Sequence, residues 1–327
     1  MLEQSRHSTK LTKPRKSKGL IMAYTGAASI ITGATTTNDL SRDVYIETLE
    51  AFNRTVVGLN NVRVQTISTG KAGQFIIGGK TSDSTVPATY ARGTQVDVTD
   101  AEFDERTIVL QRPVYEAKRV DQFEERVAHY DIRSVITNQM GESLGNKVDR
   151  EVFDTLFLSA NGTGIVSNPD AGQVAAITYT GTAKQKGDLL AEAIFEAAAK
   201  LQENDVNEAP VCVLNPVDYS NLVQSDRAVN ADYTNSNGGI DSGMVMEVAG
   251  VRILRSNNLK GNNGGSTTAK LLGLVFTPEA AGVLELIGMT TNQEKQIDFL
   301  DATLMTAYYA NGMGILRPEC AVALMEA

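Results

Sequence analysis

The chain has 327 residues, 42% of them hydrophobic and 21% charged, which is ordinary for a globular protein of one elaborate domain or two lobes. Its net charge of −9 argues against a general nucleic-acid coat, and no stretch reaches the ~18 apolar residues that a membrane span needs. Two cysteines, Cys212 and Cys320, are too few for a disulfide framework and lack paired metal spacing, which indicates a reducing compartment.

The basic charge is concentrated in an N-terminal tail. Residues 1–18 hold six lysines or arginines against one glutamate, a charge of +5, so the rest of the chain carries −14. Up to residue 39 there is little helical periodicity, and residues 1–39 are predicted to form an arm. The tail is open to three interpretations: salt-sensitive contact with nucleic acid, binding to an acidic partner, or simple solvation. Residues 20–34 are too polar for the apolar centre of an export signal, and Met22 is an alternative start of translation.

A short helix and a long β-hairpin are predicted next. Residues 41–54 carry apolar side chains at helical spacing, and Ser41 or Asp43 can cap the first turn. Residues 62–112 begin with an alternating segment at 62–67, which a glycine break at 70–73 interrupts and which resumes at 75–77. A turn-rich segment at 82–104 follows, and the chain returns as a strand at 107–110. Because such a hairpin has few large apolar side chains, it would be marginal alone, and we expect it to lie on another subunit.

A long helix is predicted over residues 131–159, after a short helix at 121–129. The segment contains no proline and would form a rod of roughly 43 Å at about 1.5 Å per residue. Its apolar residues recur at four-residue steps, so the stripe turns by about 40° per step and must meet different neighbours along the helix. We therefore expect an elongated protein built on this helix. The stripe consists of Ile132, Ile136, Met140, Leu144, Val148, Val152 and Leu156.

The remaining residues mix helices and strands without a regular βαβ order, which favours an α+β fold. The pattern predicts an alanine-rich helix at 188–201 and helices that open at Pro216 and Pro278. It predicts strands at 175–180, 211–214, 251–254 and 271–276, then strands at 296–309 and 315–325 on either side of a turn at 311–314.

One sequence motif suggests chemistry, the G-x-S-x-G of residues 141–145 with Ser143 at its centre. A nucleophile elbow needs a strand, a sharp turn and then a helix, whereas these residues lie inside the predicted long helix. The only histidines, His7 and His129, precede the serine, while the hydrolase order places the histidine after it. We therefore predict no catalytic residue, and the scattered histidines and cysteines predict no metal site or cofactor.

Four separated stretches together resemble the major capsid protein of short-tailed, podovirus-type bacteriophages. Four matches in the family's order are more specific than a single motif. They are EAFNRTVVG (50–58), STGKAGQF (68–75), AHYDIRSVITNQMGESLG (128–145) and GILRPECAVAL (314–324).

The resemblance implies the HK97-like fold and a division of the chain into its parts. It also places candidate inter-subunit contacts in and beside the hairpin, at Lys71, Phe75, Arg92 and Arg112. The expected parts are an N-terminal arm (1–39), the first part of the P-domain (40–61), the E-loop hairpin (62–112), the P-domain with its spine helix at about 131–159 (113–187), the A-domain (188–280) and a return to the P-domain (281–327).

The function implied is that of a structural protein rather than an enzyme. Hexamers and pentamers would assemble in the cytoplasm of the host bacterium into the icosahedral head of the virion, enclosing double-stranded DNA that they contact non-specifically, with no membrane involved. Portal, scaffolding and decoration proteins are the expected further partners. Two alternatives are an encapsulin-type nanocompartment shell and a serine hydrolase using Ser143. Lys71, Lys80 and Asn311 provide the residue types of a lysine–asparagine cross-link, but the family that the chain resembles does not rely on one.

Overall fold

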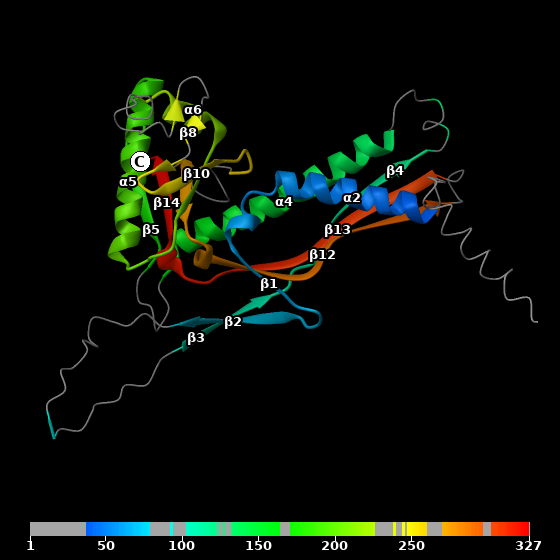
Figure 1. Ribbon diagram of the computed structural model, residues 1–327, viewed down its shortest axis with the longest axis horizontal. Helices are drawn as coiled ribbons and strands as arrows, with labels where there is room; N and C mark the ends of the chain where they lie inside the picture. Colours follow the sequence, from blue (N-terminus) through cyan, green and yellow to red (C-terminus); the bar gives the residue numbers. More distant parts are fainter. Residues whose placement is uncertain are drawn as a thin grey trace, which may run out of the picture.

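The computed structural model describes residues 37–78, 92–93, 103–121, 123, 127, 132–163, 171–225, 238–239, 244–245, 247–259, 270–296 and 302–326. Within these residues the chain forms two lobes, each built on its own sheet, and the long helix α4 (Ile132–Ala160) runs from one lobe to the other (Figure 1). Residues 1–36 of the predicted arm and most of the predicted helix at 121–129 lie outside the described residues, and the last three residues of the predicted arm, 37–39, are helical instead.

The four-stranded lobe holds a sheet of order β1-β12-β13-β4 with two helices on one face. Strand β1 (Arg63–Thr66) pairs in parallel with β12 (Ala281–Gln296), and β13 (Ala302–Ile315) pairs antiparallel with both β12 and β4 (Val114–Val120). Helix α2 (Thr37–Thr55) and α4 cover this face. The core between helices and sheet includes Phe52, Met140, Leu144, Met305 and Tyr309.

The six-stranded lobe has the sheet order β5-β14-β11-β6-β10-β9. Helices α5 (Ala183–Glu203) and α6 (Pro216–Val223) pack on one face, and the C-terminal half of α4 packs on the other. A separate pair of short strands is formed by β7 (Gly238–Gly239) and β8 (Met244–Val245). The strands of the large sheet are β5 (Gln173–Ile177), β6 (Val211–Leu214), β9 (Glu247–Val248), β10 (Val251–Arg255), β11 (Leu271–Phe276) and β14 (Ala321–Glu326).

The long helix and its winding apolar stripe are confirmed. Met140, Leu144 and Val148 are buried in the core of the four-stranded lobe. Val152 and Leu156, farther along the same stripe, are buried instead against the six-stranded sheet. Because the stripe rotates around the axis, one helix supplies both cores and thereby ties the lobes together.

The predicted hairpin is shorter than expected: its extended segment at 75–77 is confirmed within β2, but the segment at 62–67 was wrongly assigned to it. Residues 63–66 form β1 and join β12, and the chain then turns at Gly70, whose φ of +124° favours glycine. The paired stem is β2 (Ala72–Gly78) with β3 (Phe103–Val109). Figure 1 shows this stem on the face of the four-stranded sheet opposite α2 and α4. The predicted tip lies outside the described residues, apart from Arg92 and Gly93.

Helix α2 begins at Thr37, so the predicted cap at Ser41 or Asp43 was wrong. Helix α5 also begins before the predicted residue 188. Its true start is a capping box, in which the Thr182 hydroxyl accepts the Gln185 N–H and the Gln185 side chain accepts the Thr182 N–H. The residues of this first turn are mainly polar and show no apolar periodicity. The sequence pattern therefore placed the start of the helix too late.

The C-terminal strands depart most from the prediction. The sequence pattern did not predict β12, which ends where the predicted strand begins, at residue 296. The reason is that two irregularities in its pairing with β13 interrupt the alternation of side chains between Glu285 and Thr290. The predicted turn at 311–314 lies inside β13. Gly312 and Gly314 lie where β3 of the hairpin passes close to the backbone of β13. A Cβ at Gly312 would meet the Val109 carbonyl oxygen at 2.5 Å. The closing strand is also shorter than predicted, because a 3-10 turn, η4 (Pro318–Cys320), precedes β14.

Candidate functional site

The hairpin stem has one face buried on its own subunit and one face open. Phe75 and Ile77 from β2 and Ile108 from β3 pack with Leu284 of β12 and with Leu316, which directly follows β13. The alternate residues point away, because successive side chains of a strand face opposite sides. On that outer face Ile76 is 60% exposed and Val109 is 62% exposed. Two large apolar side chains therefore remain uncovered on the outer face of the stem.

The four predicted contact residues fall in two classes. Lys71, Arg92 and Arg112 are exposed, with Lys71 and Arg112 at the base of the hairpin and Arg92 in a turn of its distal part. Phe75 is only 1% exposed, and the Arg63 guanidinium lies 5.7 Å from the centroid of its ring. The Phe75 side chain thus holds the hairpin on its own sheet and is not open to a neighbour in this arrangement. The contacts of the other three stay predictions.

The G-x-S-x-G motif is a helix-packing motif rather than a nucleophile elbow. It lies within α4, where a Cβ at Gly141 would meet the Thr48 carbonyl oxygen of α2 at 2.4 Å. One turn later, a Cβ at Gly145 would meet the Phe52 carbonyl oxygen at 3.3 Å. Two glycines four residues apart let the backbones of α2 and α4 approach. Ser143 points outward and donates a hydrogen bond to the Glu116 carboxylate at 3.4 Å, so the structure contradicts the hydrolase alternative.

Asp149 on α4 anchors the connection between α2 and β1. Its buried carboxylate accepts the backbone N–H groups of Val57 and Gly58, both at 2.9 Å. Burial raises the pKa of this carboxyl above its ordinary value, and the hydrogen bonds from Val57, Gly58 and Asn258 oppose the shift only in part. Nothing in the local sequence distinguishes Asp149 from a solvated residue, because its partners lie about ninety positions earlier.

A second polar site lies where the chain passes between the two sheets. The passage from β11 to β12 goes through the 3-10 turn η2 (Pro278–Ala280), and the passage from β13 to β14 goes through η4. We call residues 277–281 and 315–321 the joint. The two passages are paired by backbone hydrogen bonds, from Thr277 N to Cys320 O at 3.1 Å and from Arg317 N to Glu279 O at 3.2 Å.

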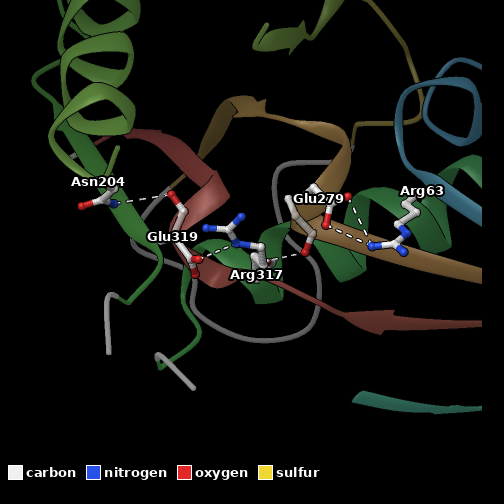
Figure 2. Close-up of polar contacts among 7 residues, drawn as sticks. Arg63, Asn204, Glu279, Arg317 and Glu319 are labelled. Atoms are coloured by element: carbon white, nitrogen blue, oxygen red, sulfur yellow. Dashed lines mark hydrogen bonds and ion pairs between the residues drawn. The ribbon is translucent and has the colours of Figure 1, made fainter. Parts of the chain in front are cut away.

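Charged side chains extend from the joint toward both lobes (Figure 2). Arg63 of β1 pairs with the Glu279 carboxylate at 3.2 Å. The Arg317 Nε donates to the Glu319 carboxylate at 2.7 Å, and Glu319 is fully buried. Burial lowers the pKa of Arg317, but the hydrogen bond and charge of Glu319 outweigh it, so the pKa lies above its ordinary value. The pattern G-I-L-R-P-E-C supplied part of the family resemblance, yet its spacing alone did not indicate this pair.

The described residues contain no group of three His, Cys, Asp or Glu side chains that could hold a metal ion. Cys212 and Cys320 are free and buried. None of the helices in the described part of the chain has the length and apolar character to cross a membrane.

An elongated α+β protomer with a spine helix shared by two lobes, and with a β-hairpin stem on the outer face of one sheet, defines the class of HK97-like capsid proteins. Similar solved structures bear this out. The chain resembles the capsid protein of cyanophage P-SCSP1u with a TM-score of 0.68 and 30% identity, covering 81% of this chain and 86% of the other. It resembles that of the bacteriophage PhiM1 mature capsid with a TM-score of 0.65, 15% identity and coverage of 82% and 86%, a likeness of fold alone.

Sequence comparison identifies the family. The chain belongs to the Gp10A-like major capsid protein family, whose model matches residues 74–325. It is 27% identical over 316 residues to the major capsid protein of Escherichia phage T7, covering 85% of this chain and 89% of the relative. This match to a phage family also decides against the encapsulin alternative.

Proposed function

We propose that the protein assembles as hexamers and pentamers into the icosahedral head of a bacteriophage, around double-stranded DNA. The observation that carries this proposal is the hairpin stem, which presents Ile76 and Val109 to the outside while its other face is buried on its own subunit. Burying such side chains on a neighbour would favour assembly by the hydrophobic effect. Many copies, each overlapping the next, would then close a shell.

The parts of the protomer take the roles expected of this fold in the proposal. The hairpin that follows β1 acts as the E-loop, the four-stranded lobe with α4 acts as the P-domain, and the six-stranded lobe acts as the A-domain. Lys71, Arg92 and Arg112 contact the neighbouring subunit. The protein acts as a structural component without enzymatic activity, and it is assembled in the cytoplasm of the host bacterium.

Further partners in the proposal are portal, scaffolding and decoration proteins. The packaged DNA is contacted only non-specifically, because residues 19–327 carry a charge of −14 and the positive charge is confined to the tail.

Electron microscopy and analytical ultracentrifugation of the purified protein test the proposal. Wild type is expected to form capsomers or shells, and Ile76→Asp with Val109→Asp is expected to abolish them while the fold, followed by circular dichroism, is kept. Val217→Asp is the matched control, because Val217 is 64% exposed but lies on α6. Wild-type protein that stays monomeric under all assembly conditions, or equal loss in the control, would contradict the proposal.

A further inference from the structure

The two passages of the joint have the same local design. Residues 277–281 read T-P-E-A-A and residues 317–321 read R-P-E-C-A. Each passage places proline first in a 3-10 turn and glutamate second, and each ends in an extended alanine that begins a strand. Proline fits the first position because it has no N–H to satisfy there. The two glutamates thus occupy equivalent places in two turns that run side by side.

Side-chain and backbone hydrogen bonds through the joint form a continuous polar connection between the lobes. At one end Arg63, on the edge strand β1 of the four-stranded sheet, pairs with Glu279. Glu279 accepts the Arg317 N–H through its backbone carbonyl, and Arg317 pairs in turn with Glu319. At the other end Asn204, the C-cap of α5, donates to the Glu319 carbonyl at 3.5 Å. We call Arg63, Glu279, Arg317, Glu319 and Asn204 the joint strap, which Figure 2 shows in full.

The position of the joint strap indicates what it controls. Helix α4 already joins the lobes through its apolar stripe, and its Ser159 hydroxyl donates to the Ala280 carbonyl at 3.1 Å. Apolar packing is non-directional and tolerates small rotations, whereas hydrogen-bonded ion pairs have preferred geometries. The strap therefore restrains rotation of one sheet relative to the other, about the contact that α4 provides.

The two ends of the joint strap differ in their exposure to solvent. The Arg63 and Glu279 side chains are 41% and 25% exposed, so solvent and salt weaken their attraction. Glu319 is fully buried beside Arg317, and removing either partner would leave a buried charge without compensation. Salt can therefore weaken the Arg63–Glu279 ion pair while the Arg317–Glu319 ion pair stays intact.

We propose that the joint strap sets the angle between the two sheets, and through it the curvature of the shell. The proposal rests on the assembly function proposed above. In a closed shell of identical subunits, a change in the angle between the parts of one subunit is repeated in every copy. A loosened strap therefore widens the distribution of shell diameters without unfolding the subunit.

The test combines shell diameters with hydrogen exchange. Glu279→Gln removes the charge at the Arg63 end, and Glu319→Gln removes it at the buried end while keeping the side-chain shape. The control is Arg54→Gln, because Arg54 pairs with Glu142 at 2.7 Å within the four-stranded lobe alone. Both joint variants are expected to give broader or shifted diameters by electron microscopy, and at least tenfold faster exchange of the Leu316 and Arg317 amides. The control is expected to match wild type.

Unchanged diameters together with unchanged exchange in Glu279→Gln would overturn the proposal, and this variant keeps the test valid if Glu319→Gln fails to fold. A change equal to that of the control would overturn it as well. If the wild type forms no shells at all, the assembly function fails, while exchange at Leu316 and Arg317 in the protomer still decides whether the strap restrains the joint.

Discussion

At the scale of single residues, the contact between α2 and α4 depends on glycine. Gly141 is placed so that a Cβ would lie 2.4 Å from a backbone oxygen of α2 and 2.8 Å from the Ala51 Cβ. Neither neighbour is the flexible end of a side chain, so the helices themselves would have to move apart. The local sequence suggested an enzyme motif, because one glycine-serine-glycine spacing fits both a sharp turn and a close helix crossing.

Gly141→Ala is therefore expected to destabilise the protein by about 1–3 kcal/mol, the usual cost of overpacking a well-packed contact. Urea unfolding followed by circular dichroism measures the loss. Ser143→Ala is the control, because this exposed position on the same helix should tolerate alanine without loss. A Gly141→Ala variant as stable as the wild type would show that the crossing can relax.

Asp149 gives a prediction with a defined sign in pH. Its pKa is raised above 3.8 by burial, so the folded protein keeps a proton there at pH values where the unfolded chain has lost it. The contribution of Asp149 to stability is therefore fully present below pH 3.8 and is lost as pH rises through the folded-state pKa. Asp149→Asn has no such dependence. The free energy of unfolding of the wild type minus that of the variant should fall with rising pH across this window, measured by urea titration at a series of pH values. A flat difference would contradict the prediction.

Among the helices and strands, those with a clear local periodicity of apolar residues could be predicted from the sequence. The spine helix, β6 and β11 were predictable because their apolar patterns are continuous over their own lengths. The Asp149 anchor and the strap contacts of Arg63 and Asn204 were not, because each forms between residues far apart in the chain. The glycines of β13 were misread as a turn for the same reason: their cause is the hairpin that crosses them, about two hundred residues earlier.

The packing of the hairpin against β13 can be tested at Gly312. A Cβ there would meet the Val109 carbonyl oxygen at 2.5 Å, so Gly312→Ala should lift β3 from the sheet. We expect faster hydrogen exchange in residues 103–110 and little change in α4. Gly288→Ala is the matched control in the neighbouring strand, where the added Cβ meets only the movable end of Glu285. Equal exchange in the two variants would show that the hairpin does not depend on this close approach.

At the scale of the whole molecule, the two lobes share a core through the C-terminal half of α4. Leu156 is fully buried in a cluster that includes Val283 of the four-stranded sheet and Leu274 and Ala323 of the six-stranded sheet. The lobes should therefore unfold together, although each has its own sheet. A shared core also means that a local change near Leu156 reaches both sides of the joint.

Leu156→Ala is expected to destabilise the protein by about 2–5 kcal/mol, through lost burial and the cavity left behind. Hydrogen exchange should accelerate in both β13 and β11, because the deleted side chain belongs to the core common to both lobes. Leu190→Ala is the comparison, since Leu190 is equally buried but packs only within the six-stranded lobe. Its effect should be strongest in β5 and β6, and weaker in β13. If Leu156→Ala left exchange in β13 at the wild-type rate, the lobes would be independent, and α4 would be a connector rather than the common core of the molecule.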